Sequence, residues 1–303
     1  MRLFRRLVAL SLCAAIFSAT IALRAEAQDL AGTLKKIKET GAITIGHRET
    51  SVPFSYYDDK QQPVGYSMDL CGKVVEAVKM ELKLPSLQVK LQPVNSSNRI
   101  PLVKNGTVDL ECGSTANYVK RQEEVGFSVS TFWVAKRFIA KTDSKLKTID
   151  DLKGKPVVVT QGTDTAGLIR TINDERKLGM VIISGKDHAE SLLTVESGRA
   201  LAFMEDDVLV AGLRANARDP KSLVLLQDSF GGDPYALMMR KDDPQFKRLV
   251  DASLTRLMAS GEADKIYAKW FQSPIPPNGV NIGYTMPEGL KALYKNPSDK
   301  AAH

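Results

Sequence analysis

Residue types that commonly carry chemistry are scarce in this chain of 303 residues. It has three cysteines and three histidines, and no group of His, Cys, Asp and Glu shows the spacing of a metal site. A nucleotide-binding glycine loop and a recognisable nucleophile and base are also missing. Lys and Arg are scattered among Asp and Glu without a basic run, which argues against nucleic acid as a partner. We therefore predict no metal, no cofactor and no catalytic residue, and we expect the protein not to be an enzyme.

Long apolar runs are missing too, except at the N-terminus. Three arginines within the first six residues precede an apolar stretch over residues 7–23, and Ala25-Glu26-Ala27 follows as a small-residue cleavage site. This pattern predicts a secretory signal peptide over residues 1–27 that is removed from the mature protein. No later stretch approaches the ~20 apolar residues that a membrane helix needs. We therefore expect a mature chain that is soluble outside the cytoplasm.

The charge and the cysteines change with that cleavage. It removes four of the 42 basic residues and one of the 35 acidic ones, so the formal charge falls by three from +7 to +4. Cys71 and Cys112 remain, and an even count in an oxidising compartment favours a disulfide over a metal site. Neither cysteine stands in CxxC spacing, so a redox role is not indicated. We predict that the two are bridged, which would stabilise the fold by roughly 3 to 4 kcal/mol through loop closure.

Short apolar segments alternate with amphipathic ones along the mature chain, a pattern typical of parallel α/β sheets. We predict strands over 42–46, 87–93, 108–111, 156–160, 181–184, 201–204 and 223–226. We predict helices over 68–82, 98–104, 165–177, 187–196 and 207–215.

Two extended apolar segments, 131–142 and 235–240, lie on either side of a self-contained block of strands and helices. Roughly 276 mature residues are too many for one typical core and comfortable for two lobes. We therefore interpret these segments as crossovers between lobes. The predicted division is residues 28–133 plus 237–272 for lobe 1, residues 134–236 for lobe 2, and a surface tail over 273–303 whose end frays.

Six sequence blocks, in order, carry a resemblance to a known family. They are Gly46–Tyr57, Ser97–Leu102, Glu111–Thr115 leading to Arg121, Val158–Thr163, Ser184–His188 and Ser197–Asp207. The chain resembles the periplasmic solute-binding proteins of amino-acid ABC transporters, and most closely the glutamate/aspartate-binding branch. This resemblance implies a type II two-lobed α/β fold with two hinge strands that closes over its ligand. It also implies a monomer in the periplasm that delivers an acidic amino acid to an ABC permease.

The resemblance implies a set of ligand-binding residues at each end of the ligand. By resemblance, Arg121 takes the α-carboxylate, where a guanidinium can form a bidentate pair. Ser114 and Thr115 would add hydroxyl and backbone donors, and Asp206 would accept the ammonium. The side-chain carboxylate would meet Arg48, Arg99 and His188, and Ser96 would add a hydroxyl beside Arg99.

His188 is predicted to begin a helix, where free N–H groups favour an anion. Since its ligand-facing nitrogen would donate more strongly when protonated, we expect a pH effect on binding.

The turn at Gln161-Gly162-Thr163 departs from the family pattern at the next residue. Thr163 is assigned to ligand binding by resemblance, but Asp164 follows where relatives commonly have a second hydroxyl residue. An acidic side chain facing an anionic ligand is unfavourable. Asp164 must therefore either turn outward and cap the helix or alter the specificity.

Two alternatives to a transport protein stay open at this point. One is an enzyme on the same fold, such as a periplasmic dehydratase or lyase, because an acid–base residue leaves no reliable local pattern. The other is a ligand sensor that feeds a membrane receptor, which needs the same pocket. A difference of one methylene is worth only ~1 to 3 kcal/mol in a pocket, so glutamate and aspartate are equally compatible with these residues.

Overall fold

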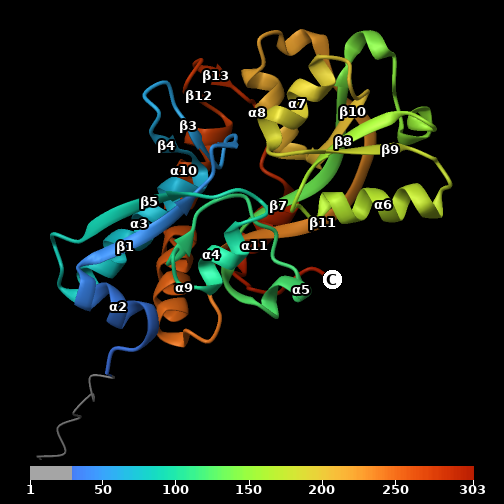
Figure 1. Ribbon diagram of the computed structural model, residues 1–303. Coiled ribbons are helices and arrows are strands. Elements are labelled where there is room, and N and C mark those ends of the chain that lie inside the picture. Colours follow the sequence, from blue (N-terminus) through green and yellow to red (C-terminus); the bar gives the residue numbers. More distant parts are fainter. Residues whose placement is uncertain (1–28) are drawn as a thin grey trace, which may run out of the picture. The chain divides into compact units, whose positions relative to one another are not determined.

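The computed structural model describes residues 29–303 (Figure 1). The predicted signal peptide, residues 1–27, lies outside the described residues. Residues 31–303 form one compact unit. No helix in the described part of the chain is long and apolar enough to cross a membrane.

One eight-stranded sheet organises this unit, with the strand order β5-β1-β6-β11-β7-β10-β8-β9. The strands are β1 (Ala42–His47), β5 (Gln88–Pro93), β6 (Leu110–Glu111), β7 (Val125–Lys141), β8 (Pro156–Thr160), β9 (Val181–Gly185), β10 (Ala202–Asp206) and β11 (Leu223–Arg240). Strands β5, β1 and β6 pair in parallel, as do β10, β8 and β9. We call these two groups the β1 side and the β8 side of the sheet. The predicted α/β class is confirmed.

The long antiparallel pair β7–β11 joins the two sides of the sheet. Strand β7 pairs with β10 on the β8 side, and β11 pairs with β6 on the β1 side. Their shared ladder has register shifts at several points, including one between Phe230 and Asp233. Because a bulge bends and twists a strand, such shifts let one pair of strands connect the β1 side and the β8 side of a single sheet. The predicted crossovers are thus extended, as expected, and longer than expected.

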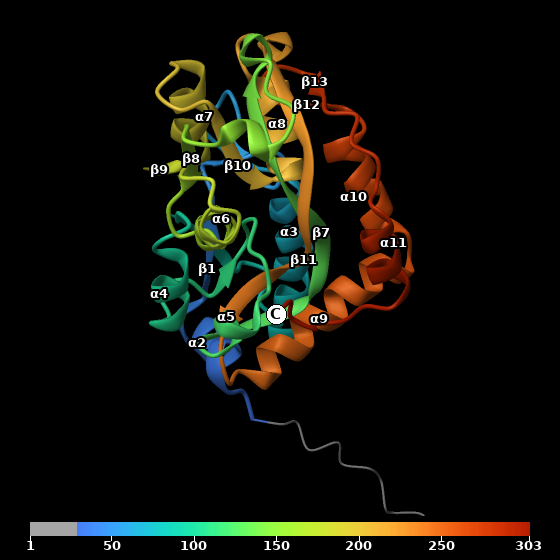
Figure 2. The same cartoon turned by 90° about the vertical axis from the view of Figure 1, so that its right-hand side faces the viewer.

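On the β8 side, helices cover both faces of the sheet. Side chains of successive strand residues point to opposite faces, so Val157, Val159 and Met204 pack with α6 (Thr165–Glu175). Val158 and Phe203 pack on the opposite face with residues of α7 (His188–Glu196) and α8 (Asp207–Asn216). Figure 2 shows α6 nearly end-on. This three-layer packing brings the N-termini of all three helices to the ends of β8, β9 and β10.

The β1 side is covered by helices that include the last long ones of the chain. The remaining helices are α2 (Gly32–Thr40), α3 (Tyr66–Leu82), α4 (Arg99–Lys104), α5 (Val119–Gln122), α9 (Pro244–Ala259), α10 (Glu262–Phe271) and α11 (Glu288–Lys295). The spacing of Phe246, Leu249, Val250, Leu254 and Leu257 predicts an apolar stripe on one helix. In α9 four of these residues are buried, and Leu249 is half-buried. Short strands complete the fold: β2 (Thr50–Ser51), β3 (Ser55–Tyr57), β4 (Pro63–Val64), β12 (Pro274–Ile275) and β13 (Val280–Asn281).

The predicted disulfide is confirmed. Cys71 in α3 is bonded to Cys112, the residue after β6, across a sequence separation of 41. Both residues are buried. The bridge therefore ties the helix that packs on α9 to the loop that carries Ser114 and Thr115.

The C-terminal tail differs from the expectation that its end frays. Ala302 forms a parallel bridge with Tyr118, donating its N–H to Asn117 O over 2.8 Å and accepting from Val119 N over 3.0 Å. Earlier in the tail, Ser298 O accepts from the N–H of Ser130 in β7 over 2.8 Å. The tail end is thus held against the segment that leads into α5.

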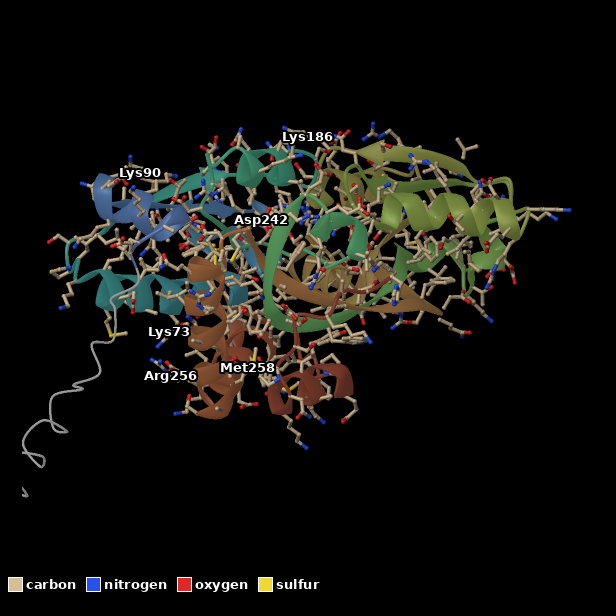
Figure 3. All side chains as sticks on the ribbon, turned by 90° about the horizontal axis from the view of Figure 1, so that it is seen from below. Lys73, Lys90, Lys186, Asp242, Arg256 and Met258 are labelled. Atoms are coloured by element: carbon tan, nitrogen blue, oxygen red, sulfur yellow. A yellow bond between two sulfur atoms is a disulfide. The ribbon has the colours of Figure 1, made fainter. Side chains whose placement is uncertain are left out.

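Charged side chains of both signs cover the outside of the molecule (Figure 3). Lys73 forms an ion pair with Glu262, while Lys90 and Lys186 are exposed. Such pairs add little stability, because water screens them.

Candidate functional site

The nine predicted site residues come from strand ends and helix starts. Arg48 follows β1, Arg99 begins α4, and Ser114 and Thr115 follow β6. On the β8 side, His188 begins α7 and Asp206 ends β10. All of these, and Ser96, are buried, whereas Arg121 and Thr163 are half-buried. Burial of so many polar side chains requires partners for them.

Arg48 brings together Ser96 and His188. Its Nη2 donates to Ser96 Oγ over 3.0 Å and lies 3.4 Å from Nε2 of His188. An arginine can only donate, so this contact makes Nε2 the accepting nitrogen of the imidazole. The proton of His188 then sits on Nδ1, which lies 3.0 Å from Thr160 Oγ1 and 3.3 Å from Glu205 Oε2.

The charge state of His188 argues against the expected pH effect on ligand binding. Burial lowers the pKa of His188 well below its ordinary value, and the Arg48 and Arg99 guanidinium groups lower that pKa further. Its imidazole is therefore neutral at neutral pH. An additional proton on Nε2 would face the Arg48 guanidinium, so stronger donation from this nitrogen is not available near pH 7.

Arg99 is held by the loop after β6. Its Nη1 donates to Ser114 O over 3.0 Å and to Thr115 Oγ1 over 2.6 Å. The Thr115 hydroxyl in turn donates a hydrogen bond to Glu111 Oε2 over 2.7 Å, so it is not free to donate to a ligand. Burial, and then Arg121, lower the pKa of Arg99 to about 9.

Glu111 is a part of the site that sequence reasoning missed. Its side chain is fully buried, and Oε1 has no hydrogen-bond partner within residues 29–303. A Cβ on Gly113 would lie 2.2 Å from that oxygen and 2.8 Å from Arg48 Cγ. Gly113 therefore gives this carboxylate room beside Arg48. Glu111, the last residue of β6, thus acts electrostatically on both Arg48 and Arg99. We call these two arginines the arginine pair.

Several buried polar atoms in the site make no hydrogen bond within the described residues. Arg48 Nη1 and Arg99 Nε are two such donors, and Asp206 Oδ1 is such an acceptor. Buried polar groups are almost always satisfied in folded proteins. Unused donors on the arginine pair suit an anion, and the unused carboxylate oxygen suits a cation.

Asp164 turns toward Arg121 rather than outward. Arg121 lies in α5, donates from Nη1 to Ala116 O over 2.8 Å, and places Nη2 3.5 Å from Asp164 Oδ1. Tyr118 OH donates to Asp164 Oδ2 over 3.0 Å. The alternative of an outward-facing helix cap is wrong, because Asp164 makes no side-chain capping bond.

Lys136 in β7 is the second residue that sequence reasoning missed. Its ammonium lies 2.9 Å from Asp164 Oδ2, 3.5 Å from Asp206 Oδ1, and in contact with Asp233. It also donates to Tyr118 OH over 3.0 Å. We call these five residues the Lys136 cluster. Alternation along β7 indicates that Lys136 is buried, because it shares a face of the strand with the buried residues Val134 and Phe138.

Electrostatics in this cluster favour the charged forms of Lys136 and Asp164. Burial pulls the pKa of Lys136 down, but Asp206, Asp164, Tyr118 and Asp233 together raise it above its ordinary value. Burial opposes ionisation of Asp164, yet Lys136 and Arg121 lower its pKa to about 2. Burial raises the pKa of Asp206 well above its ordinary value, and the Glu205 and Asp164 carboxyls add to the rise, although Lys136 and the hydroxyl of Tyr235, which donates to Oδ2, oppose it.

The predicted turn before α6 approaches the β1 side closely. Gly162 has φ +77°, and a Cβ there would lie 2.6 Å from Ser97 N, so only glycine fits. Thr163 Oγ1 donates to Thr160 O over 2.7 Å and accepts from Ala166 N over 3.3 Å. The Thr163 hydroxyl thus braces the turn. Asp206 and His188 on the β8 side, and the arginine pair on the β1 side, flank it.

These features are typical of two-sided α/β binding proteins. The long strands β7 and β11 join the two sides of the sheet, and a buried, charged site lies where the sides meet. Residues 43–273 match the family model of bacterial extracellular solute-binding proteins, family 3, and the chain belongs to this family. The L-glutamate/L-aspartate-binding protein of Pseudomonas aeruginosa is 51% identical over 100% of this chain and 99% of its own. The glutamate/aspartate import solute-binding protein of Escherichia coli K12 is 48% identical over 97% of each.

Solved structures show the same fold. An arginine-binding protein mutant from T. maritima covers 79% of this chain and 99% of its own with a TM-score of 0.70 at 22% identity. A substrate-binding protein of an ABC uptake transporter from Streptococcus pneumoniae covers 80% and 97% with a TM-score of 0.70 at 21% identity. The predicted two-lobed fold is confirmed. The family and its relatives are binding proteins, so the expectation of a binding protein rather than an enzyme is also confirmed.

Proposed function

We propose that this protein binds L-glutamate or L-aspartate outside the cytoplasm and delivers it to a membrane-embedded ABC permease. The observation that carries the proposal is the arginine pair: Arg48 and Arg99 are both 2% exposed, and each has a buried N–H group without a partner in residues 29–303. Two buried guanidinium groups suit a carboxylate far better than a neutral side chain. The names of the close relatives point to the same ligands.

The opposite end of the site suits the α-amino acid group. We assign Arg121 to the ligand α-carboxylate and Asp206 to the ligand ammonium. The ammonium would donate to Oδ1 of Asp206, which has no hydrogen-bond partner within the described residues. Ser96 and His188 support the distal end through Arg48. We assign Ser114 and Thr115 to the distal end as well, rather than to the α-carboxylate end that the resemblance implies, because Arg99 donates to both. Thr163 shapes the turn between the two ends. These roles account for all nine predicted residues.

Capture and delivery follow from two lobes that close on the ligand. The proposed lobes are residues 28–133 plus 237–272 and residues 134–236, with β7 and β11 as the hinge and the tail over 273–303 packed on the surface. We propose that the chain acts as a monomer in the periplasm after loss of residues 1–27.

Selectivity against amides follows from the buried charge. Glutamine in place of glutamate would leave the arginine pair short of one negative partner, which costs at least ~2 kcal/mol. This free energy corresponds to roughly 30-fold in affinity.

The test is calorimetric titration of protein that has been unfolded, freed of carried-over ligand and refolded. We expect one-to-one binding of glutamate and aspartate, with glutamine and asparagine weaker by about 30-fold or more. Preference for an amide, or no binding of any of the four, would overturn the proposal.

A further inference from the structure

Lys136 places a positive charge where the proposed ligand would place its own. Its side chain is 1% exposed, and its Nζ lies 3.5 Å from Oδ1 of Asp206. The same Oδ1 atom is buried and has no hydrogen-bond partner within the described residues. A ligand ammonium bound to this oxygen would sit about 3 Å from it. It would then lie within about 6.5 Å of the lysine ammonium.

The charges around Lys136 are arranged so that a ligand ammonium is not the sole counter-ion of Asp206. The Lys136 ammonium forms ion pairs with three carboxylates, those of Asp164, Asp206 and Asp233. If Lys136 were neutral, a ligand without an amino group would leave Asp206 buried without a positive partner, which is strongly unfavourable. Since Lys136 is charged, part of that penalty is already removed. The two ammonium groups would also repel each other.

We propose that Lys136 relaxes the requirement for a ligand ammonium, so that the site also takes dicarboxylic acids that carry no amino group. This inference rests on the proposed function, because it assigns the distal carboxylate to the arginine pair. Glutarate is the simplest such ligand. It matches glutamate in its two carboxylates and the chain between them, and lacks only the amino group. The ratio of the two dissociation constants therefore isolates the ammonium.

The experiment is calorimetric titration of glutamate and glutarate into the refolded wild-type protein and the variant Lys136→Met. We expect wild-type protein to bind glutarate measurably, within about 100-fold of glutamate. In Lys136→Met we expect glutarate to weaken relative to glutamate by about tenfold or more. Lys90→Met, at an exposed lysine (Figure 3), is the matched control and should leave the ratio unchanged.

Two outcomes would overturn the inference. One is wild-type protein that binds glutamate but shows no glutarate binding at millimolar concentration, a result that does not depend on the folding of any variant. The other is an unchanged ratio in a folded Lys136→Met protein. Both leave the proposed function standing, whereas wild-type protein that binds neither ligand refutes the proposed function itself.

Discussion

Asp164 Oδ1 lies 3.5 Å from Nη2 of Arg121, so a carboxylate of the protein itself faces the arginine assigned to the ligand α-carboxylate. Asp164 stays ionised at all ordinary pH values, because Lys136 and Arg121 lower its pKa to about 2 against the opposing effect of burial. A bound α-carboxylate must share this arginine and is repelled by Asp164.

We therefore predict that Asp164→Ser binds glutamate more tightly, by about tenfold, which corresponds to ~1.4 kcal/mol. Titration calorimetry measures the change. Asp174→Ser, at an exposed position of the same helix, serves as control and should bind as the wild type does. Weaker binding by Asp164→Ser would mean that this carboxylate helps to hold the ligand or the closed lobes.

The C-terminal tail should contribute to ligand affinity although it is far along the chain from the site residues. Ala302 exchanges backbone hydrogen bonds with Asn117 and Val119, and α5 carries Arg121. Deleting residues 297–303 removes these bonds and that of Ser298, at about 1 kcal/mol each. It also removes the contacts of Asp299 with Asn117, Gln122 and Lys247, which add less because they are partly exposed. We expect the free energy of unfolding to fall by about 2 to 3 kcal/mol. We also expect the glutamate dissociation constant to rise by about tenfold.

Urea denaturation and calorimetry measure the two effects of this deletion. Removing only His303 leaves Ala302 in place and is the matched control. An unchanged dissociation constant in the longer deletion would show that α5 holds Arg121 without the tail.

Glu205 should make the stability of the protein fall as the pH rises. Burial raises the pKa of this carboxyl from 4.5 to about 7. Between these values the folded state holds a proton that the unfolded state has lost, so the stabilisation is complete below pH 4.5 and lost as the pH rises through 7. At ~1.4 kcal/mol for each unit, the loss is roughly 3 kcal/mol.

The variant Glu205→Gln removes this titration with little change in shape. We expect its free energy of unfolding to vary less between pH 5 and 8 than that of the wild type, and to exceed the wild-type value at about pH 8. Urea denaturation at several pH values measures both. Parallel pH profiles for the two proteins would assign the pH dependence to another group.

Strand ends and helix starts of this fold could be predicted from residue patterns alone. Strand β8 was predicted with the observed bounds, Pro156–Thr160, and the start of α6 at Thr165 was also predicted. Buried parallel strands are short apolar runs bounded by turn residues, which makes them visible in sequence. The true length of β7 and β11 was not visible, because their pairing depends on partners far away in the chain and on bulges.

The site was harder to predict wherever one side chain depends on another. Arg48 and Asp206 stand at strand ends, where function is expected, and they lie in the site. Lys136 was missed because a lysine inside a strand normally faces water, and its burial requires Asp164, Asp206 and Asp233, which come from three other segments. The orientation of Asp164 depends on the same lysine. Such mutual dependence has no local sequence pattern.

The most direct measurement compares glutamate and glutamine binding in wild-type protein and in Arg48→Met, with Arg256→Met, an exposed arginine (Figure 3), as the control. Arg48 is buried and keeps Nη1 unpartnered within residues 29–303, so its charge should act on the distal carboxylate. We predict that Arg48→Met weakens glutamate by roughly 30-fold or more while glutamine changes far less. Equal losses for both ligands would contradict an acidic side-chain site at the arginine pair.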